Sequence, residues 1–171
     1  LLTIGKGITG GYVAMAATVA NDRVYEQFLG EDLSERTLYH GHSYSGNALA
    51  AAVGLRHLEL FDEWVVLGNV RERAAQMAEL LDDHLVDLPE VRAIRQQGLM
   101  VGIELAPPPD ASRWGRRVSA ECVRRGVLVR PLGDVVVLMP ILTSTEDEIE
   151  RIVTVVAESI TAVGADPAGV G

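Results

Sequence analysis

Apolar positions in the second half of the chain follow helical periodicity. Between Asn69 and Pro89 they recur every three or four residues. These positions are Val70, Ala74, Met77, Leu81 and Leu85. The spacing predicts an amphipathic helix whose opposite face is charged, and proline closes it because proline cannot continue a helix.

Short apolar runs farther along predict strands that alternate with two more helices. The expected strands cover residues 91–97 and 99–105, which meet near Gly98, and residues 127–130 and 135–139, which a turn at 131–134 separates. Pro107 to Pro109 predict a loop, since neither a helix nor a strand passes through them easily.

The two later helices have recognisable ends. One is expected from about Ser112 to Gly126, a residue suited to the position just after a helix. The last begins at Thr145, whose hydroxyl can form a capping box with Glu148, and runs to about Val163.

The first third of the chain has a different pattern. An apolar strand at residues 1–4 precedes a glycine-rich turn and an extended stretch over 12–19. Asn21 is placed to cap a short helix that reaches Phe28. Polar residues 30–47 then lead into a long helix rich in Ala and Leu that ends near Trp64, and such polar segments often carry function.

These elements predict an α/β chain with two domains. Residues 1–64 are interpreted as the end of one α/β domain, residues 65–163 as a complete α+β domain, and residues 164–171 as a disordered tail. The apolar start without an initiator Met suggests that a natural N-terminal part is missing.

Charge and composition exclude some classes of function. The net charge of −9 argues against a nucleic-acid surface, which needs clustered cations. No apolar run reaches the roughly 20 residues that a membrane helix needs.

A single cysteine, Cys122, is interpreted as core filler and fits a reducing cytoplasm. Several arginines at helical spacing predict a solvated helix face. They are Arg113, Arg116, Arg117, Arg124 and Arg125.

The glycine-rich turn at residues 5–11 allows more than one interpretation. It matches G-x-G-x-x-G, and Asp22 or Glu26 lies in range for a nucleotide ribose. However, the residues after Gly11 do not predict the helix that a dinucleotide site requires. A phosphate-binding P-loop is excluded, because Gly7 rather than Ser or Thr follows the lysine.

Lys6 favours covalent chemistry with a carbonyl group. It is the only lysine in a chain that has 14 arginines among its 15 cationic side chains. A Schiff base requires a neutral amine, so we expect Lys6 to lie in a crowded, buried turn that lowers its affinity for a proton. A surface lysine in an ordinary turn is the alternative.

Four segments, taken in order, resemble the class III aminotransferases, which are pyridoxal phosphate (PLP) enzymes of fold type I. The segments are Gly5-Lys6-Gly7-Ile8-Thr9-Gly10-Gly11-Tyr12, His40-Gly41-His42-Ser43-Tyr44-Ser45-Gly46-Asn47, Ile94-Arg95-Gln96-Gln97-Gly98-Leu99-Met100, and Arg130-Pro131-Leu132-Gly133-Asp134 with Leu138-Met139-Pro140. The resemblance implies the C-terminal part of that fold, namely the end of the large α/β domain and the small α+β domain. It also implies a homodimer with a shared active site.

The resemblance assigns roles to five residues. Lys6 corresponds to the lysine that binds PLP and moves the proton during transfer. Ser43 corresponds to a hydroxyl that reaches the PLP phosphate of the partner subunit. His42, beside it, is also expected to bind the cofactor. Arg130 corresponds to the arginine that binds the substrate carboxylate, with Gly41 also at the substrate. No metal site is expected, since His40 and His42 lack further ligands nearby.

The implied reaction is amino transfer from S-adenosylmethionine or lysine to a keto acid of biotin synthesis. Another class III branch, which acts on an ω-amino acid or a diamine, and a truncated relic without activity remain alternatives. Ala14, Ala48 and Ile141 stand where the family often has proline. The family's phosphate loop, its stacking aromatic residue and the aspartate that binds the pyridine nitrogen would precede Leu1, so we expect residues 1–171 alone to be inactive.

Overall fold

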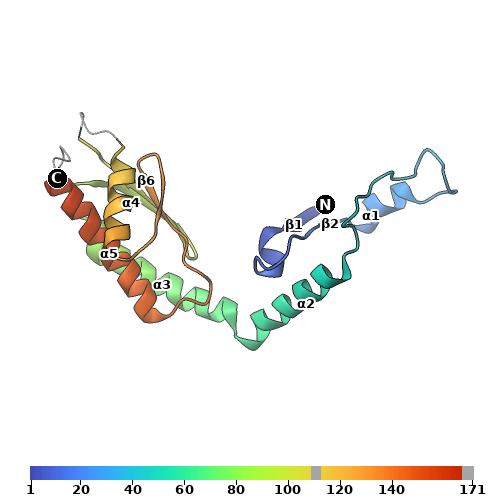
Figure 1. Cartoon of the computed structure of the whole chain (residues 1–171), viewed down its shortest axis with the longest axis horizontal. Coiled ribbons are helices and arrows are strands. Elements are labelled where there is room, and N and C mark those ends of the chain that lie inside the picture. Colours follow the sequence, from blue (N-terminus) through green and yellow to red (C-terminus); the bar gives the residue numbers. More distant parts are fainter. Residues whose placement is uncertain (109–112, 167–171) are drawn as a thin grey trace. The chain divides into compact units, whose positions relative to one another are not determined.

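The computed structural model describes residues 1–108 and 113–166 and divides into two compact units. Unit 1 covers Leu1–Val65 and unit 2 covers Val66–Gly171. Figure 1 labels several of their helices and strands and colours the chain along its sequence. Each unit is described by itself.

Unit 1 consists of a two-stranded hairpin, three short helical segments and one long helix. In chain order its elements are β1 (Leu2–Gly5), the 3-10 helix η1 (Lys6–Thr9), β2 (Ala16–Val19), α1 (Asp22–Tyr25), the 3-10 helix η2 (Glu26–Phe28) and α2 (Ala48–Glu63). The strands pair antiparallel, with Leu2 opposite Val19.

Polar side chains start both α-helices of unit 1. The Oδ1 atom of Asn21 accepts a hydrogen bond from the Val24 amide, which confirms the predicted cap. Asn47 caps α2 in the same way, accepting bonds from the amides of Leu49 and Ala50. The extended stretch predicted for residues 12–19 is only partly right, because the strand covers Ala16–Val19 alone.

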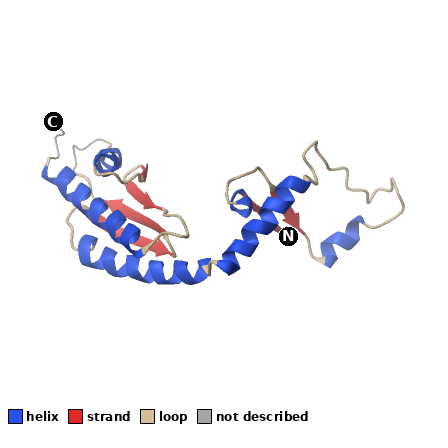
Figure 2. Ribbon diagram, turned by 60° about the horizontal axis from the view of Figure 1, so that its bottom comes forward, coloured by secondary structure: helices blue, strands red, loops and turns tan. Residues whose placement is uncertain are grey.

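Unit 2 is an antiparallel sheet with three helices packed on one face (Figure 2). The strand order is β3-β4-β6-β5. Its elements are α3 (Val66–Leu85), β3 (Val91–Gln97), β4 (Met100–Leu105), α4 (Trp114–Arg124), β5 (Arg130–Leu132), β6 (Val135–Leu138) and α5 (Glu146–Ala165). Alternate residues of β4 and β6 are buried, as expected for a sheet with one covered face.

One apolar core fills the space between the sheet and the helices of unit 2. Its largest fully buried side chains include Trp114, Met77, Leu85, Ile103 and Ile149. Met77 and Leu85 belong to the apolar stripe that the sequence predicts for α3. Gly126 adopts a φ of 87° just after α4, and the capping box of Thr145 and Glu148 is present.

Several predicted boundaries in unit 2 are wrong. Helix α3 begins at Val66, earlier than expected, and α5 continues through Gly164 to Ala165. The strand predicted for residues 127–130 is β5, Arg130–Leu132. The Val127 amide still bonds to the Cys122 carbonyl and so belongs to the end of α4. The strand therefore begins later in the sequence than predicted.

Some predictions fall on residues outside the described part. They are the helix start at Ser112, Pro109 of the proline loop, and residues 167–171 of the tail. Within residues 1–108 and 113–166, no helix is both long and apolar enough to cross a membrane.

Candidate active site

Lys6 lies at the turn between the strands of unit 1. It directly follows β1 and opens η1, and its φ of 53° is in the left-handed region. Only a few per cent of non-glycine residues adopt such a φ. Gly10 and Gly11 extend the turn with φ values of 61° and 85°. The turn therefore contains a lysine whose own backbone is strained, with two left-handed glycines at its far end.

The expectation that Lys6 lies in a crowded, buried turn is wrong for this unit. Lys6 is exposed, and a side chain added at the neighbouring Gly7 would contact nothing within 4 Å. Only Thr9 of η1 is buried. The reason is that α2 covers η1 on one side, while no element of unit 1 covers the side that carries Lys6.

Helix α2 contacts η1 at two points, and a side-chain hydrogen bond from η1 to the segment before β2 adds to them. The Nδ1 atom of His57 lies 3.1 Å from the Ile8 carbonyl oxygen. Gly54 brings the helix backbone close, since a Cβ there would lie 3.7 Å from the same oxygen. The Thr9 hydroxyl donates to the Val13 carbonyl oxygen at 2.5 Å. These contacts fix the turn that follows Lys6.

Gly41, His42 and Ser43 lie in the exposed loop before α2. The His42 amide donates to the Ser45 hydroxyl at 3.2 Å, and the Tyr44 amide donates to His42 Nδ1 at 3.1 Å. An Nδ1 atom that accepts a bond leaves the imidazole proton on Nε2. The Ser43 hydroxyl stands exposed beside this ordered turn and is accessible to a ligand.

Arg130 is the first residue of β5 in unit 2. Residues directly opposite one another on paired strands share a face of the sheet. Arg130 is opposite Val137, Val137 is opposite Gly102, and Gly102 is opposite Arg95. This row crosses the sheet face that the helices leave open. Arg130 is exposed and forms no ion pair with any described residue, whereas Arg95 pairs with Glu104 at 3.0 Å.

The turn that follows Arg130 is fixed from α4. The Asp134 carboxylate accepts a hydrogen bond from the Gly115 amide at 3.1 Å. A Cβ at Gly115 would lie 2.2 Å from the Gly133 carbonyl oxygen, so only glycine fits there. The first turn of α4 therefore presses directly on the link between β5 and β6.

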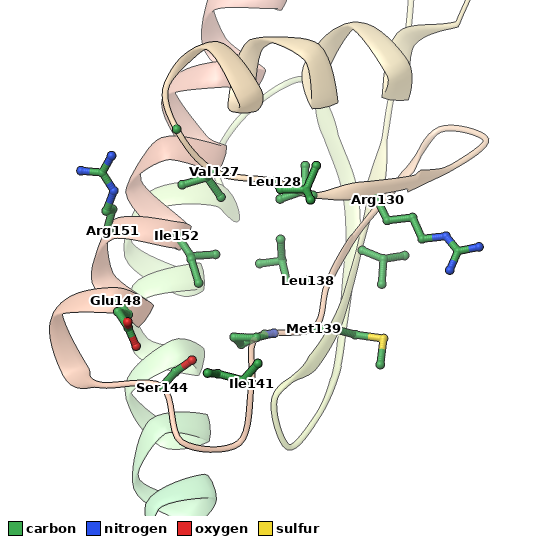
Figure 3. Close-up of a pocket in the computed structure, with 14 residues that line it drawn as sticks. Val127, Leu128, Arg130, Leu138, Met139, Ile141, Ser144, Glu148, Arg151 and Ile152 are labelled. Carbon is green, nitrogen blue, oxygen red and sulfur yellow. The ribbon is translucent and has the colours of Figure 1, made fainter. Parts of the chain in front are cut away.

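A pocket of about 680 Å³ lies next to Arg130 (Figure 3). Apolar side chains such as Val127, Leu138 and Ile152 line it. Arg130 and Arg151 stand on opposite sides, with their guanidinium groups directed away from these side chains. The pocket is thus an apolar surface with Arg130 at its edge, and Arg130 forms no ion pair with any residue of the described part of the chain.

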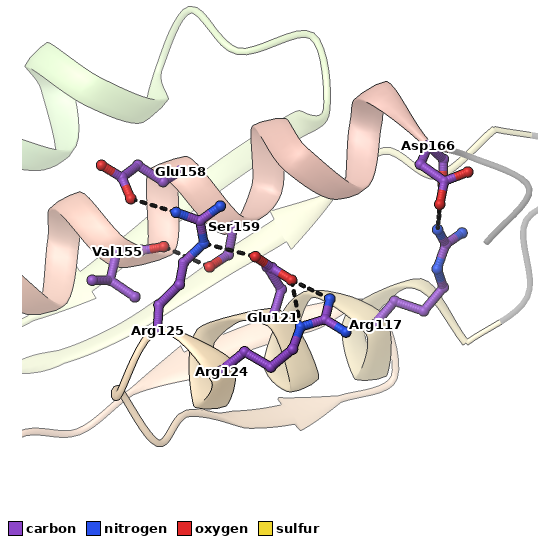
Figure 4. Close-up of polar contacts among 8 residues, drawn as sticks. All are labelled: Arg117, Glu121, Arg124, Arg125, Val155, Glu158, Ser159 and Asp166. Carbon is purple, nitrogen blue, oxygen red and sulfur yellow. Dashed lines mark hydrogen bonds and ion pairs between the residues drawn. The ribbon is translucent and has the colours of Figure 1, made fainter. Parts of the chain in front are cut away.

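Arginines in and just after α4 bind acidic residues of α4 itself and of the region around α5 (Figure 4). Arg125 contacts Glu121 at 2.8 Å and Glu158 of α5 at 2.7 Å. Arg124 also binds Glu121, and these guanidinium groups lower the pKa of the Glu121 carboxyl. Arg117 binds Asp166 near the end of α5. The predicted solvated face is therefore partly wrong, because its charges join α4 to α5.

The structure places the predicted site residues in two groups. Lys6 and the loop with Gly41, His42 and Ser43 belong to unit 1, and Arg130 belongs to unit 2. Sequence reasoning missed His57 as a contact of the lysine turn. A glycine inside a helix, here Gly54, was the available signal, because such a residue often marks a close approach of backbones.

Comparisons with known proteins show the family. The sequence pattern of the class III aminotransferases matches residues 1–160. The chain belongs to this family. Class III aminotransferases are PLP-dependent enzymes, and the mixed helix and sheet arrangement described above matches their structures.

Similar relatives include the adenosylmethionine-8-amino-7-oxononanoate aminotransferase of Nitratidesulfovibrio vulgaris, which is 47% identical over 97% of this chain and 32% of its own length. The crystal structure of the Methanocaldococcus jannaschii enzyme of that name is 38% identical, with a TM-score of 0.86 over 94% of this chain and 38% of the other. Diaminobutyrate–2-oxoglutarate transaminase of Halomonas elongata is 32% identical over 90% of this chain and 34% of its own length. The chain spans about a third of these relatives.

Proposed function

We propose that this chain is the C-terminal part of a fold type I enzyme and that Lys6 binds its PLP. The observation that carries the proposal is the family match over residues 1–160, which includes the one lysine of the chain. The exposed amine of Lys6 and the open space at Gly7 leave room for a flat ring. In this proposal residues 1–64 end the large PLP-binding domain, and residues 65–163 form the small domain.

The reaction would be amino transfer in two halves. Bound PLP supplies an electron sink for the bond broken at the donor's Cα. The Nζ atom of Lys6, when neutral, would take the proton from that Cα and return it at C4′ of the cofactor. Its place on a short, strained turn would keep the amine within reach of both atoms.

Other site residues would bind and orient. Arg130 would hold the keto acid's carboxylate, a role that suits an exposed guanidinium without an ion-pair partner among residues 1–108 and 113–166. The Ser43 hydroxyl would bind the PLP phosphate of the partner subunit in a homodimer, with the ordered His42 turn supporting it. Gly41 would let the loop approach the substrate closely.

We further propose that the acceptor is 8-amino-7-oxononanoate and the product 7,8-diaminononanoate, a step of biotin synthesis. The names of the relatives from Nitratidesulfovibrio vulgaris and Methanocaldococcus jannaschii support this substrate and an S-adenosylmethionine donor. Lysine is the alternative donor. The apolar pocket beside Arg130 suits an acceptor with a long aliphatic chain and one carboxylate.

Reduction with borohydride tests the role of Lys6. In the complete enzyme saturated with PLP, we expect a phosphopyridoxyl mass on the peptide that contains Lys6, and Lys6→Ala should lose both the mass and the activity. A peptide without this mass in a PLP-saturated sample would contradict the proposal. It would favour a chain that only folds and dimerises.

Substitutions of Arg130 test the carboxylate site. Arg130→Gln should raise KM for the keto acid by roughly 10- to 100-fold, because a charge-assisted pair is lost. Arg130→Lys should recover only part of this, since lysine lacks the planar fork. Arg92→Gln is the matched control, an exposed arginine of the same sheet that pairs with Glu104. Equal effects of Arg130→Gln and Arg92→Gln would contradict the assignment.

A second candidate is a class III enzyme for diamines or ω-amino acids. The Halomonas elongata relative, named for diaminobutyrate, favours it. Steady-state rates with 8-amino-7-oxononanoate and with 4-aminobutyrate separate the candidates. A higher kcat/KM for 4-aminobutyrate would replace the first proposal with the second.

A further inference from the structure

The backbone at Lys6 needs support from elsewhere in the fold. Its φ of 53° lies in the left-handed region, where a lysine persists only when its surroundings hold it. It opens η1, a four-residue 3-10 helix, and such short helices have poor hydrogen-bond geometry. Within the turn, the Gly10 amide bonds to the Gly7 carbonyl at 3.0 Å. Beyond it, the Tyr12 amide bonds to the Thr9 carbonyl at 3.2 Å and the Thr9 hydroxyl bonds to the Val13 carbonyl, so all of these bonds join residues of the same short segment.

Helix α2 supplies the missing support through His57. The Nδ1 atom of His57 lies 3.1 Å from the carbonyl oxygen of Ile8, which is 49 positions away in the sequence. A carbonyl oxygen only accepts, so Nδ1 carries the proton and the imidazole donates. The bond ends two residues after Lys6, inside the same helical turn.

The imidazole is itself held on two sides. Its ring contacts the edge of Phe61 on α2, with centroids 5.1 Å apart and an interplanar angle of 79°. On the other side, a Cβ at Gly10 would lie 3.0 Å from Cδ2 of His57. The close fit against Gly10 leaves the ring little freedom to turn away from Ile8.

We propose that His57 is a positioning residue for Lys6. Its hydrogen bond to the Ile8 carbonyl keeps η1 docked on α2, and so keeps the Lys6 amine in one place while it moves the substrate proton. His57 would contact neither substrate nor cofactor and would act through the backbone of η1. The inference rests on the proposed function of Lys6.

Three substitutions in the complete, PLP-loaded enzyme test the proposal. His57→Leu removes the donor, His57→Asn places an amide donor near the Nδ1 position, and His57→Gln places it farther out. The matched control is His84→Leu, an exposed histidine of α3 in unit 2. The readouts are kcat, KM for the keto acid, and the pH titration of the visible absorbance that arises when Lys6 is joined to PLP.

We expect His57→Leu to lower kcat about tenfold or more, since a small displacement of a reacting group is costly. KM should stay within about twofold, and the absorbance titration should shift. His57→Asn should recover most of kcat and restore the titration, while His57→Gln should not. His84→Leu should match the wild type. A purely structural role would change folding or yield but not the titration of the loaded enzyme.

The proposal is overturned if loaded His57→Leu keeps the wild-type kcat and titration. If His57→Leu does not fold, the comparison of His57→Asn with His57→Gln decides, and equal values overturn the proposal. Borohydride mapping of the wild type separates the proposed function of Lys6 from the proposed positioning role of His57. A wild type without an adduct on Lys6 overturns the proposed function and this inference together, whereas an adduct without any His57 effect overturns the inference alone.

Discussion

The two units differ in how much of themselves they bury. Unit 2 packs three helices and a sheet around a continuous apolar core. Unit 1, all of whose residues are described, buries only Thr9, Ala50 and Gly54. Its large apolar side chains are mostly exposed, among them Tyr12 at 86% and Leu49 at 79%. Yet unit 1 holds Lys6 and the loop with Ser43.

This contrast teaches that the candidate cofactor-binding residues lie in unit 1, whereas most of the apolar burial lies in unit 2. Unit 2 has the apolar burial that offsets the loss of chain entropy, and unit 1 by itself does not. Contiguous exposed apolar residues mark surfaces that other protein surfaces cover. We therefore expect the residues around Lys6 to depend on contacts from outside unit 1.

The largest expected difference concerns the units produced separately. Residues 66–171 should unfold in one cooperative transition, whereas residues 1–65 should show no cooperative transition, because they lack a core. Circular dichroism during urea titration measures both. Cooperative unfolding of residues 1–65 alone would remove the contrast between the units.

Truncation of apolar side chains should show the same contrast on a smaller scale. Trp114→Ala should lower the free energy of unfolding by about 3–5 kcal/mol, since it opens a cavity in the core of unit 2. Leu49→Ala, in unit 1, should change it by less than about 0.5 kcal/mol. Both are measured on residues 1–171 by urea unfolding, and similar losses would contradict the distinction.

Cys122 provides a sharper probe of the core of unit 2. Burial raises the pKa of its thiol. Above the unfolded pKa of about 8.5, the unfolded chain loses this proton while the folded chain keeps it. The stability contribution is therefore present below that pH and declines by up to about 1.4 kcal/mol per pH unit until the folded pKa is reached.

Cys122→Ala is the control for this effect. Below pH 8.5 the variant should be less stable than the wild type, because it loses buried volume. Between pH 8.5 and 10, however, its free energy of unfolding should fall less steeply than that of the wild type. Urea unfolding at several pH values measures the difference in slope. Parallel slopes for the two proteins would show that the thiol ionises equally in both states.

Much of unit 2 could be predicted from local patterns. The stripe through Met77 and Leu85 predicted α3, and Thr145 with Glu148 predicted the start of α5, because periodicity and capping act over a few residues. The start of β5 was missed. Its position depends on the bond from Val127 to Cys122 that ends α4, and strand assignment depends on partners that lie far away in the sequence.

The sequence indicates candidate site residues but not the contacts that hold them. Lys6, Ser43 and Arg130 came from glycine spacing, composition and family resemblance. The prediction that Lys6 is buried was wrong, because the exposure of Lys6 depends on which elements cover the turn. His57 was missed because a single helical histidine gives no local sign of a partner 49 positions away, at Ile8.

The contact at Gly115 has a consequence for comparing related sequences. Because Gly115 has no side chain, the Gly133 carbonyl can lie directly against it. Gly133 belongs to the turn that follows β5, the strand whose first residue is Arg130. A homologue that keeps this arginine but has a bulkier residue at position 115 must shift the turn or α4. Position 115 therefore serves as a diagnostic marker. It separates homologues that keep the geometry around the arginine from those that have the arginine in their sequence without that geometry.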